Sequence, residues 1–243
     1  MRIAIVADIH GNRTAFEAVL EDLRQTSPDL VLHGGDLADG GASPVEVVDR
    51  IRDLGWRGVQ GNTDQMLADP GTLEAFSRRH PGLGGMFRLV EEMAAATRNT
   101  LGEERLSWLR GLPLELAAGP VALVHGTPSS PWQALPPDTA DDDLERHFRP
   151  LGQPIAVYAH THLPFVRRLP GLVVANAGSV GLSYDGDRRA AYLLIDGTEP
   201  TIRRVEYDVD TEIRALCTCS LPHSGWITRL LEAGAFQMPP AGD

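Results

Sequence analysis

The stretch MRIAIVADIHG, residues 1–11, decides the fold, because a long apolar run there ends in Asp8 and His10 just before a glycine. Residues 2–8 alternate too little between apolar and polar types for a half-exposed strand. They therefore predict a strand that is buried on both faces, as in a layered α/β fold.

Outward from this strand, the chain alternates helix and strand. Apolar residues then recur at helical spacing, at Phe16, Val19, Leu20 and Leu23. This helix is expected to stop near Ser27-Pro28, before a strand at 30–35. Ser43 and Pro44 suit the N-cap and first position of a second helix, which leads to a strand ending at Val59. The order βαβαβ predicts parallel strands with right-handed crossovers.

The remainder of the chain predicts a helical insertion and a second set of strands. Residues 66–111 carry helical patterns that are broken at Pro81-Gly82 and Gly84-Gly85. Strands are expected at 114–126, 155–160, 164–169, 172–176, 189–196 and 202–208. We expect 209–243 to hold two short helices and a Pro/Gly tail that frays. The interpretation is a single domain, 1–243, of two packed sheets with helices outside and the insertion 66–111 within it.

Composition limits the function. The 243 residues are 42% hydrophobic, which is enough for a buried core, and they carry a net charge of −11. Stable binding to nucleic acid or to a membrane surface needs positive charge and is therefore disfavoured. No apolar run reaches the roughly 20 residues of a membrane helix, and the amino terminus does not suit a secretory signal. Cys217 and Cys219 are too close for an unstrained pair, so we expect free thiols in a cytoplasmic protein.

Five apolar runs end in residues that bind metals. They are IAIVADIH (3–10), LVLHGGD (30–36), WRGVQGNTD (56–64), VALVHG (121–126) and IAVYAHTH (155–162). Strands that end this way bring their side chains to one edge of a sheet. The candidate ligands are Asp8, His10, Asp36, Asn62, His125, His160 and His162. Their oxygen and imidazole donors suit two divalent metals.

Each motif alone also has an ordinary structural interpretation. Asp8 could cap a helix beside a solvent-exposed histidine, Asp36 and Asn62 could sit in plain turns, and His160 and His162 could form a hydrogen-bonded core pair. The metal hypothesis depends on all of them occurring together at strand ends. If the backbone stays extended from Asp8 to His10, both side chains point to the same side and can hold one ion.

Four further residues have expected roles. His33 lies inside a strand and is expected to pack in the core or support the site. Asn12 and Arg13, together with Asn62, are candidate substrate contacts, and Asn12 is equally suited to be an N-cap. Asp64 is expected to orient Asn62 or His125 from behind the ligands.

The order D-x-H, G-D, G-N-x-D, H-G and H-T-H resembles the calcineurin-like metallophosphoesterase superfamily. DIHGN, GGDLADGG, LVHGTP, HTHLPF, NAGSVG and DGDRRAAYLL extend the similarity to about Asp208, within a compact bacterial branch of phosphodiesterases and diadenosine-tetraphosphatase-like phosphatases. The resemblance implies a four-layer αββα sandwich with a two-metal centre of Mn, Fe or Zn. It implies that Asp8, His10, Asp36 and His162 hold one ion, and that Asp36, Asn62, His125 and His160 hold the other.

The implied activity is hydrolysis of phosphate mono- or diesters, by attack of a hydroxide that bridges the two metals. The expected catalytic residues are Asp36, Asn62, Asp64 and His125, and the substrate is a small phosphate ester, with nucleotides among the candidates. The alternative is a catalytically weakened, metal-binding regulatory protein of the same fold. A metallo-β-lactamase fold is disfavoured because no H-x-H-x-D-H run occurs. The sequence carries no signal for an oligomeric state.

Three positions depart from the family pattern. Thr63 stands where many relatives have a histidine that can protonate the leaving group, which threonine cannot do near neutral pH. Ala159 replaces a usual glycine before His-Thr-His, and Ala177 replaces a usual proline. The threonine puts attack on esters with poor leaving groups in doubt, and the two alanines are expected to be tolerated.

Overall fold

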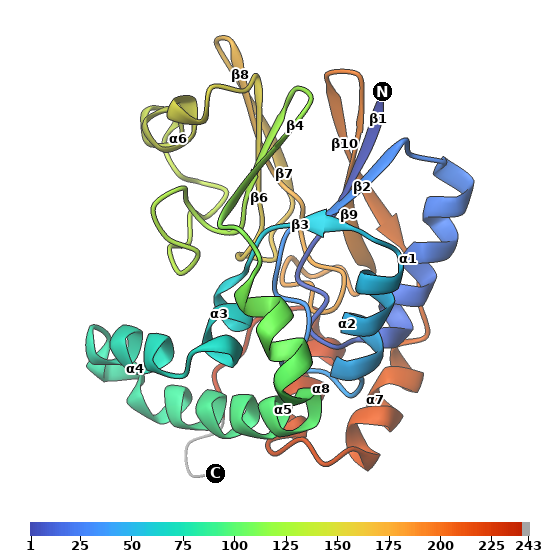
Figure 1. The fold of residues 1–243 in the computed structure, drawn as a ribbon, viewed down its shortest axis with the longest axis vertical. Coiled ribbons are helices and arrows are strands. Elements are labelled where there is room, and N and C mark those ends of the chain that lie inside the picture. The colour runs from blue at the N-terminus through green and yellow to red at the C-terminus, as the bar shows by residue number, and fades with distance from the viewer. Residues whose placement is uncertain (240–243) are drawn as a thin grey trace.

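A computed structural model describes residues 1–239. The protein has two five-stranded sheets packed face to face (Figure 1). The first sheet has the order β10 (Glu199–Val205), β9 (Ala190–Asp196), β1 (Arg2–Val6), β2 (Leu30–His33), β3 (Arg57–Gly58). The second has the order β4 (Glu115–Ala118), β5 (Val121–Val124), β6 (Ile155–Tyr158), β8 (Leu172–Asn176), β7 (Phe165–Leu169). With helices on both outer faces, the expected αββα sandwich is confirmed.

β1 lies at the centre of the first sheet and is buried on both faces, as predicted. Ile3 and Ile5 belong to the apolar cluster between the two sheets, whereas Ala4 and Val6 belong to the cluster beneath the helices. This division follows from the two-residue period of a strand. β1 pairs in parallel with β2, and β2 with β3, so the predicted βαβαβ order is confirmed.

Helices cover the outer faces. α1 (Arg13–Thr26) and α2 (Pro44–Asp53) pack on the first sheet through buried apolar residues such as Phe16 and Val47. On the second sheet, α6 (Asp141–Phe148) packs through Leu144 and Phe148. α7 (Val209–Thr218) and α8 (Ser224–Ala233) lie at the end of the sandwich where α1 begins (Figure 1).

Between β3 and β4 the chain is helical, with α3 (Asn62–Ala68), α4 (Gly71–Arg78) and α5 (Gly84–Arg110). The break expected at Pro81-Gly82 is confirmed as a short 3-10 turn, Pro81–Leu83, between α4 and α5, whereas Gly84-Gly85 begins α5 and does not break it. The long helix is interrupted instead at Gly102, where φ is 72° and ψ is 164°. Glycine adopts this backbone conformation because it lacks a Cβ. α4 projects from the body of the molecule (Figure 1).

The end of the chain differs in detail from the sequence interpretation. The strand expected at 202–208 is shifted to 199–205, because a tight turn at Gly197 sets its antiparallel register with β9. Residues 240–243 of the predicted fraying tail lie outside the described residues. Cys217 and Cys219 are free, as expected. Within 1–239, no helix combines the length and the apolar character needed to cross a bilayer.

Candidate metal centre

The seven candidate ligands meet at one edge of the sandwich. Parallel strands that run in the same direction end at the same edge, and the segments after β1, β2, β5 and β6 all lead to it. Asn62 differs slightly from expectation, because it is the first residue of α3 and not the end of a strand. Its side chain nevertheless reaches His125, as described below.

The extended backbone expected from Asp8 to His10 is wrong. Both residues have φ of 51°, in the left-handed region, and Asp36, His160 and His162 also have positive φ. This conformation is uncommon for residues other than glycine and is held by the surrounding structure. The amides of Asp8 and His10 donate to the carbonyls of Gly35 and Asp36, each at 3.0 Å, which fixes the two ligand loops to one another.

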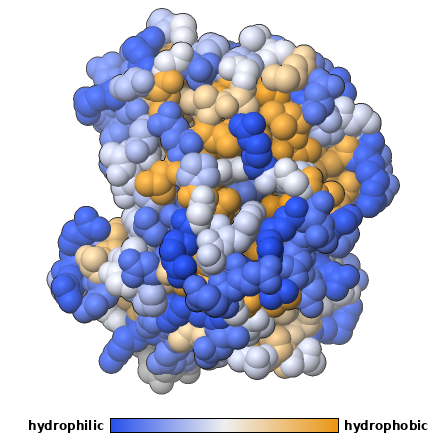
Figure 2. All heavy atoms as spheres, viewed as in Figure 1, coloured by the Kyte–Doolittle hydropathy of each residue, from blue (hydrophilic) through white to orange (hydrophobic). Residues whose placement is uncertain are grey.

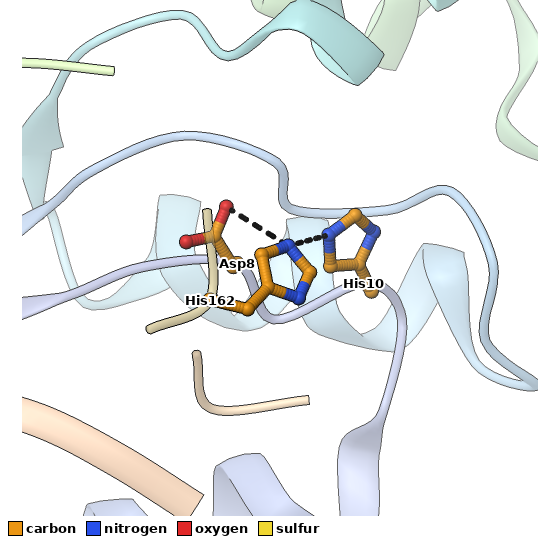
Figure 3. A group of neighbouring side chains, drawn as sticks. All are labelled: Asp8, His10 and His162. Atoms are coloured by element: carbon orange, nitrogen blue, oxygen red, sulfur yellow. Dashed lines mark hydrogen bonds and ion pairs between the residues drawn. The ribbon is translucent and has the colours of Figure 1, made fainter. Parts of the chain in front are cut away.

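The ligands form two groups. Asp8, His10 and His162 form the first, and Asp36, His125 and His160 form the second; within each group the potential ligand atoms lie within 4.8 Å of one another. Figure 3 shows the first group, with His162 between the other two side chains. His162 Nε2 is 3.6 Å from Asp8 Oδ1 and 3.2 Å from His10 Nε2.

Asp36 belongs to the second group and also lies close to the first. Its Oδ2 is 3.7 Å from His10 Nε2 and 3.4 Å from His125 Nε2. In the second group, Asn62 Oδ1 is 2.9 Å from His125 Nε2. A carboxylate placed in this way can give one oxygen to each of two ions.

Main-chain carbonyls orient the imidazole rings. Nδ1 of His10 donates to Asp39 O at 2.7 Å, and Nδ1 of His125 donates to Gly34 O at 2.7 Å. Nδ1 of His162 donates to Leu182 O at 2.5 Å. Because a carbonyl only accepts, each Nδ1 carries a hydrogen, and in the neutral ring each Nε2 then offers a lone pair to the site. Such outer partners are typical of histidines that bind metals.

The electrostatics of the site favour cations. Burial raises the pKa of Asp8 well above its usual range, and Asp8 Oδ1 has no hydrogen-bond partner among residues 1–239. Burial alone would lower the pKa of His125, but Asp36 raises it to about 9. Burial would likewise raise the pKa of Asp36, yet His125 holds it below its usual value. Thus the buried carboxylates require positive charge beside them, and oxygen and imidazole donors fit divalent ions.

Asp64 contacts the main chain and not the side chains it was expected to orient. Its carboxylate accepts hydrogen bonds from the amides of Asp36, Leu37 and Gly61, at 2.9, 3.0 and 2.9 Å. Burial and the nearby Asp36 raise its pKa to about 6. Asp64 therefore links two segments of the chain. One is the loop that carries Asp36, and the other is Gly61, which precedes Asn62.

Two of the candidate substrate contacts, Asn12 and Arg13, lie at the start of α1, whereas Asn62 begins α3 beside His125. Asn12 is buried, accepts from the amide of Ala15 at 2.9 Å and donates to Gly181 O at 3.0 Å. It is the N-cap of α1, and both ends of its amide are bonded within the protein. Arg13 is exposed at the first position of that helix.

His33 lies in the core, as expected. It is fully buried, neither ring nitrogen has a hydrogen-bond partner among the described residues, and its ring is 6.0 Å from that of Trp108. Burial lowers its pKa to about 3.

Residues after β8 also support the site, and they were not identified individually from the sequence. Ser179 Oγ donates to Asp8 O at 2.7 Å, and Asn176 Nδ2 donates to Ala159 O at 2.6 Å. Tyr184 stacks on His162 with ring centres 4.3 Å apart. The signal was present, because β8 is a further apolar strand that ends in polar residues at the same edge.

The structure is thus an α/β sandwich that carries two histidine–aspartate groups able to hold metal ions. A family model for the calcineurin-like phosphoesterase superfamily domain matches residues 1–199, and the chain belongs to this superfamily.

Similar proteins span nearly the whole chain. An uncharacterized protein of Methanocaldococcus jannaschii is 30% identical over 96% of this chain and 98% of its own length. The crystal structure of a metallophosphoesterase from Sphaerobacter thermophilus is 27% identical, covers 97% of this chain and 99% of its own, and has a TM-score of 0.79. A hypothetical protein from Pyrococcus horikoshii shares the fold, with 22% identity, coverage of 97% and 99%, and a TM-score of 0.84.

Proposed function

We propose that this protein is a phosphoesterase that uses two divalent metal ions to hydrolyse a small phosphate mono- or diester. Asp8, His10 and His162 would hold one ion, and Asn62, His125 and His160 the other, with Asp36 shared between them. Mn, Fe and Zn all fit this donor set. When bound, the two ions would lower the pKa of a water molecule and neutralise phosphate oxygens.

One observation carries the proposal: His10 Nε2 and His162 Nε2 face each other at 3.2 Å while both Nδ1 atoms donate to carbonyls. Two lone pairs at this distance repel one another unless a cation lies beside them. A structural histidine pair would place a hydrogen between the rings. The arrangement therefore supports metal binding over a hydrogen-bonded core pair.

The protein supplies position and access. Asn62, Thr63 and His160 are partly exposed, whereas Asp8, His10, Asp36, His125 and His162 are buried. Substrate would thus approach from the side of α3 and His160. The amide of Thr63 donates to Asp36 Oδ1 at 2.8 Å, which helps to hold the shared carboxylate.

Thr63 limits the chemistry. It occupies the position where the family resemblance places a proton-donating histidine, and its hydroxyl is buried without a hydrogen-bond partner among residues 1–239. We expect efficient hydrolysis only of esters whose leaving group needs no proton, such as p-nitrophenolate. Replacement of Thr63 by His would then extend activity to alkyl leaving groups.

The test is hydrolysis of bis(p-nitrophenyl) phosphate with Mn²⁺, Fe²⁺ or Zn²⁺. The Asp36→Asn variant should lose activity, and Asp69→Asn, which changes an exposed carboxylate, should retain it. Circular dichroism shows whether each protein is folded. Lack of turnover by folded wild type with every metal would reject the proposal.

The second candidate is a metal-binding regulatory protein with weak or no catalysis, and the observation that favours it is Thr63. Such a protein would bind the ions as proposed, and its turnover would not depend on Asp36. If wild type binds the metal ions but is as inactive as Asp36→Asn, this alternative is favoured.

A further inference from the structure

A cavity of about 550 Å³ lies between α4 and the loop that follows β5. Its lining includes Phe76, Arg79 and His80 from the region of α4, and Trp132 and Gln133 from the loop. In Figure 2 the outline of the molecule is indented between the upper body and the projection that Figure 1 labels α4. The volume falls in the range of small-molecule sites.

Aromatic rings gather in this cavity. The ring centre of Phe76 is 4.8 Å from that of Trp132, with 32° between the planes, and 4.3 Å from that of His80. The guanidinium of Arg79 lies 5.6 Å from the centre of the Phe76 ring. Phe76 and Trp132 are half-buried, whereas His80 and Arg79 are exposed. The cavity thus offers flat π surfaces beside a positive charge.

Trp132 connects the cavity to the metal centre. Its Nε1 donates to Gln65 Oε1 at 2.6 Å, and Gln65 follows Asn62 by one turn of α3. The cavity is therefore fixed to α3, the helix that begins with the candidate ligand Asn62, and Asn62 is on the exposed side of the site.

We propose that this cavity binds the base of a nucleotide ester whose phosphate lies at the metal centre. The inference rests on the proposed function and specifies its substrate class. Aromatic side chains bind bases by stacking, and Arg79 can add a cation–π contact or meet a further phosphate. Sugar and alkyl phosphates have no π face and could not stack on these rings.

The first test measures binding. AMP is titrated into the protein, with and without Mn²⁺, while tryptophan fluorescence is recorded. Saturable quenching is expected because a base stacks on Trp132. The quenching should be lost in Trp132→Phe and kept in Trp56→Phe, since Trp56 packs against Phe16 of α1 and does not line the cavity. Absence of saturable quenching, or its survival in Trp132→Phe, would overturn the proposal.

The second test compares two diesters with the same p-nitrophenolate leaving group. One carries thymidine through its 5′-phosphate, and the other carries a methyl group. In Phe76→Leu, which keeps an apolar side chain but removes the π face, KM for the thymidine ester should rise about tenfold relative to KM for the methyl ester. The ratio of the two kcat values should change little. An unchanged ratio of KM values would argue that the cavity does not hold the base.

The outcomes separate the two proposals. Hydrolysis of both esters with no effect of Phe76→Leu and no AMP quenching rejects the base site and leaves the phosphoesterase in place. AMP quenching that depends on Trp132, without turnover of either ester, supports the base site and rejects the catalytic function.

Discussion

His10 Nε2 and His162 Nε2 lie 3.2 Å apart at the centre of the first ligand group, although the residues are 152 positions apart in the chain. The carbonyls of Asp39 and Leu182 hold the hydrogens of both rings on the opposite nitrogens. Both Nε2 atoms therefore face the space in which we propose that a metal ion binds.

Metal content gives the most direct prediction. Wild type should bind two Mn²⁺ per chain, and His162→Gln and His160→Gln should each retain about one, because each removes a ligand from a different group. Inductively coupled plasma mass spectrometry after dialysis measures the ratio. His80→Gln, which changes an exposed histidine outside both groups, is the control. Equal loss of both ions in the two variants would contradict separate sites.

Gly61 leaves room for Asp36, the carboxylate that we propose is shared between two ions. A Cβ at this position would lie 2.0 Å from Asp36 Oδ1 and 2.4 Å from Asp36 N, so Gly61→Ala must displace Asp36. We expect lower metal occupancy and loss of phosphodiesterase activity. At Gly85 a Cβ meets nothing within 4 Å, so Gly85→Ala is the matched control. Full occupancy in Gly61→Ala would show that Asp36 is not shared.

Asp64 is expected to hold in place the loop that carries Asp36 and the residue before Asn62. Asp64→Asn turns an NH₂ group toward main-chain N–H donors that now bond a carboxylate, and should lower the free energy of unfolding by about 2 kcal/mol or more. Urea denaturation measures the change. Asp69→Asn, at an exposed carboxylate, should stay within about 0.5 kcal/mol of wild type. A stable Asp64→Asn protein with unchanged metal content would refute this role.

Asn12 should prove to be a structural residue. Asn12→Ala removes the N-cap of α1 and should cost about 1 kcal/mol of unfolding free energy. Its KM should remain near that of wild type if the side chain does not contact substrate. Thermal denaturation and steady-state kinetics measure the two effects separately. A large rise in KM with normal stability would instead restore the substrate-binding role expected from the sequence.

The buried His33 should make the free energy of unfolding depend on pH. Its pKa falls from 6.5 in the unfolded chain to about 3 in the fold because of burial, so the unfolded state takes up a proton first as pH drops. The contribution of neutral His33 to the free energy of unfolding is fully present above about pH 6.5, and it is lost as the pH falls toward 3. Between pH 7 and pH 5 it amounts to about 2 kcal/mol.

The His33→Leu variant tests this assignment, because an apolar side chain suits a site in which neither ring nitrogen has a partner among the described residues. Its unfolding free energy should fall by about 2 kcal/mol less than that of wild type between pH 7 and pH 5. Parallel losses in the two proteins would assign the effect to other histidines.

The sequence alone predicted the αββα sandwich and the convergence of the candidate ligands. The buried run at 2–8 and the order βαβαβ predict a parallel sheet, and parallel strands bring their ends to one edge. Local pattern was sufficient here because burial on both faces and polar strand ends leave a clear periodic signal. The same signal marks Asn176 and Ser179 after β8.

Only the tertiary structure decided the details that depend on contacts between distant segments. The left-handed backbone of Asp8 and His10 is set by hydrogen bonds to Gly35 and Asp36, which no local pattern encodes. The main-chain partners of Asp64, the capping role of Asn12 and the bond between Trp132 and Gln65 likewise depend on packing between elements far apart in the chain. The sequence determined which donors are available, and the fold decided which atoms face one another.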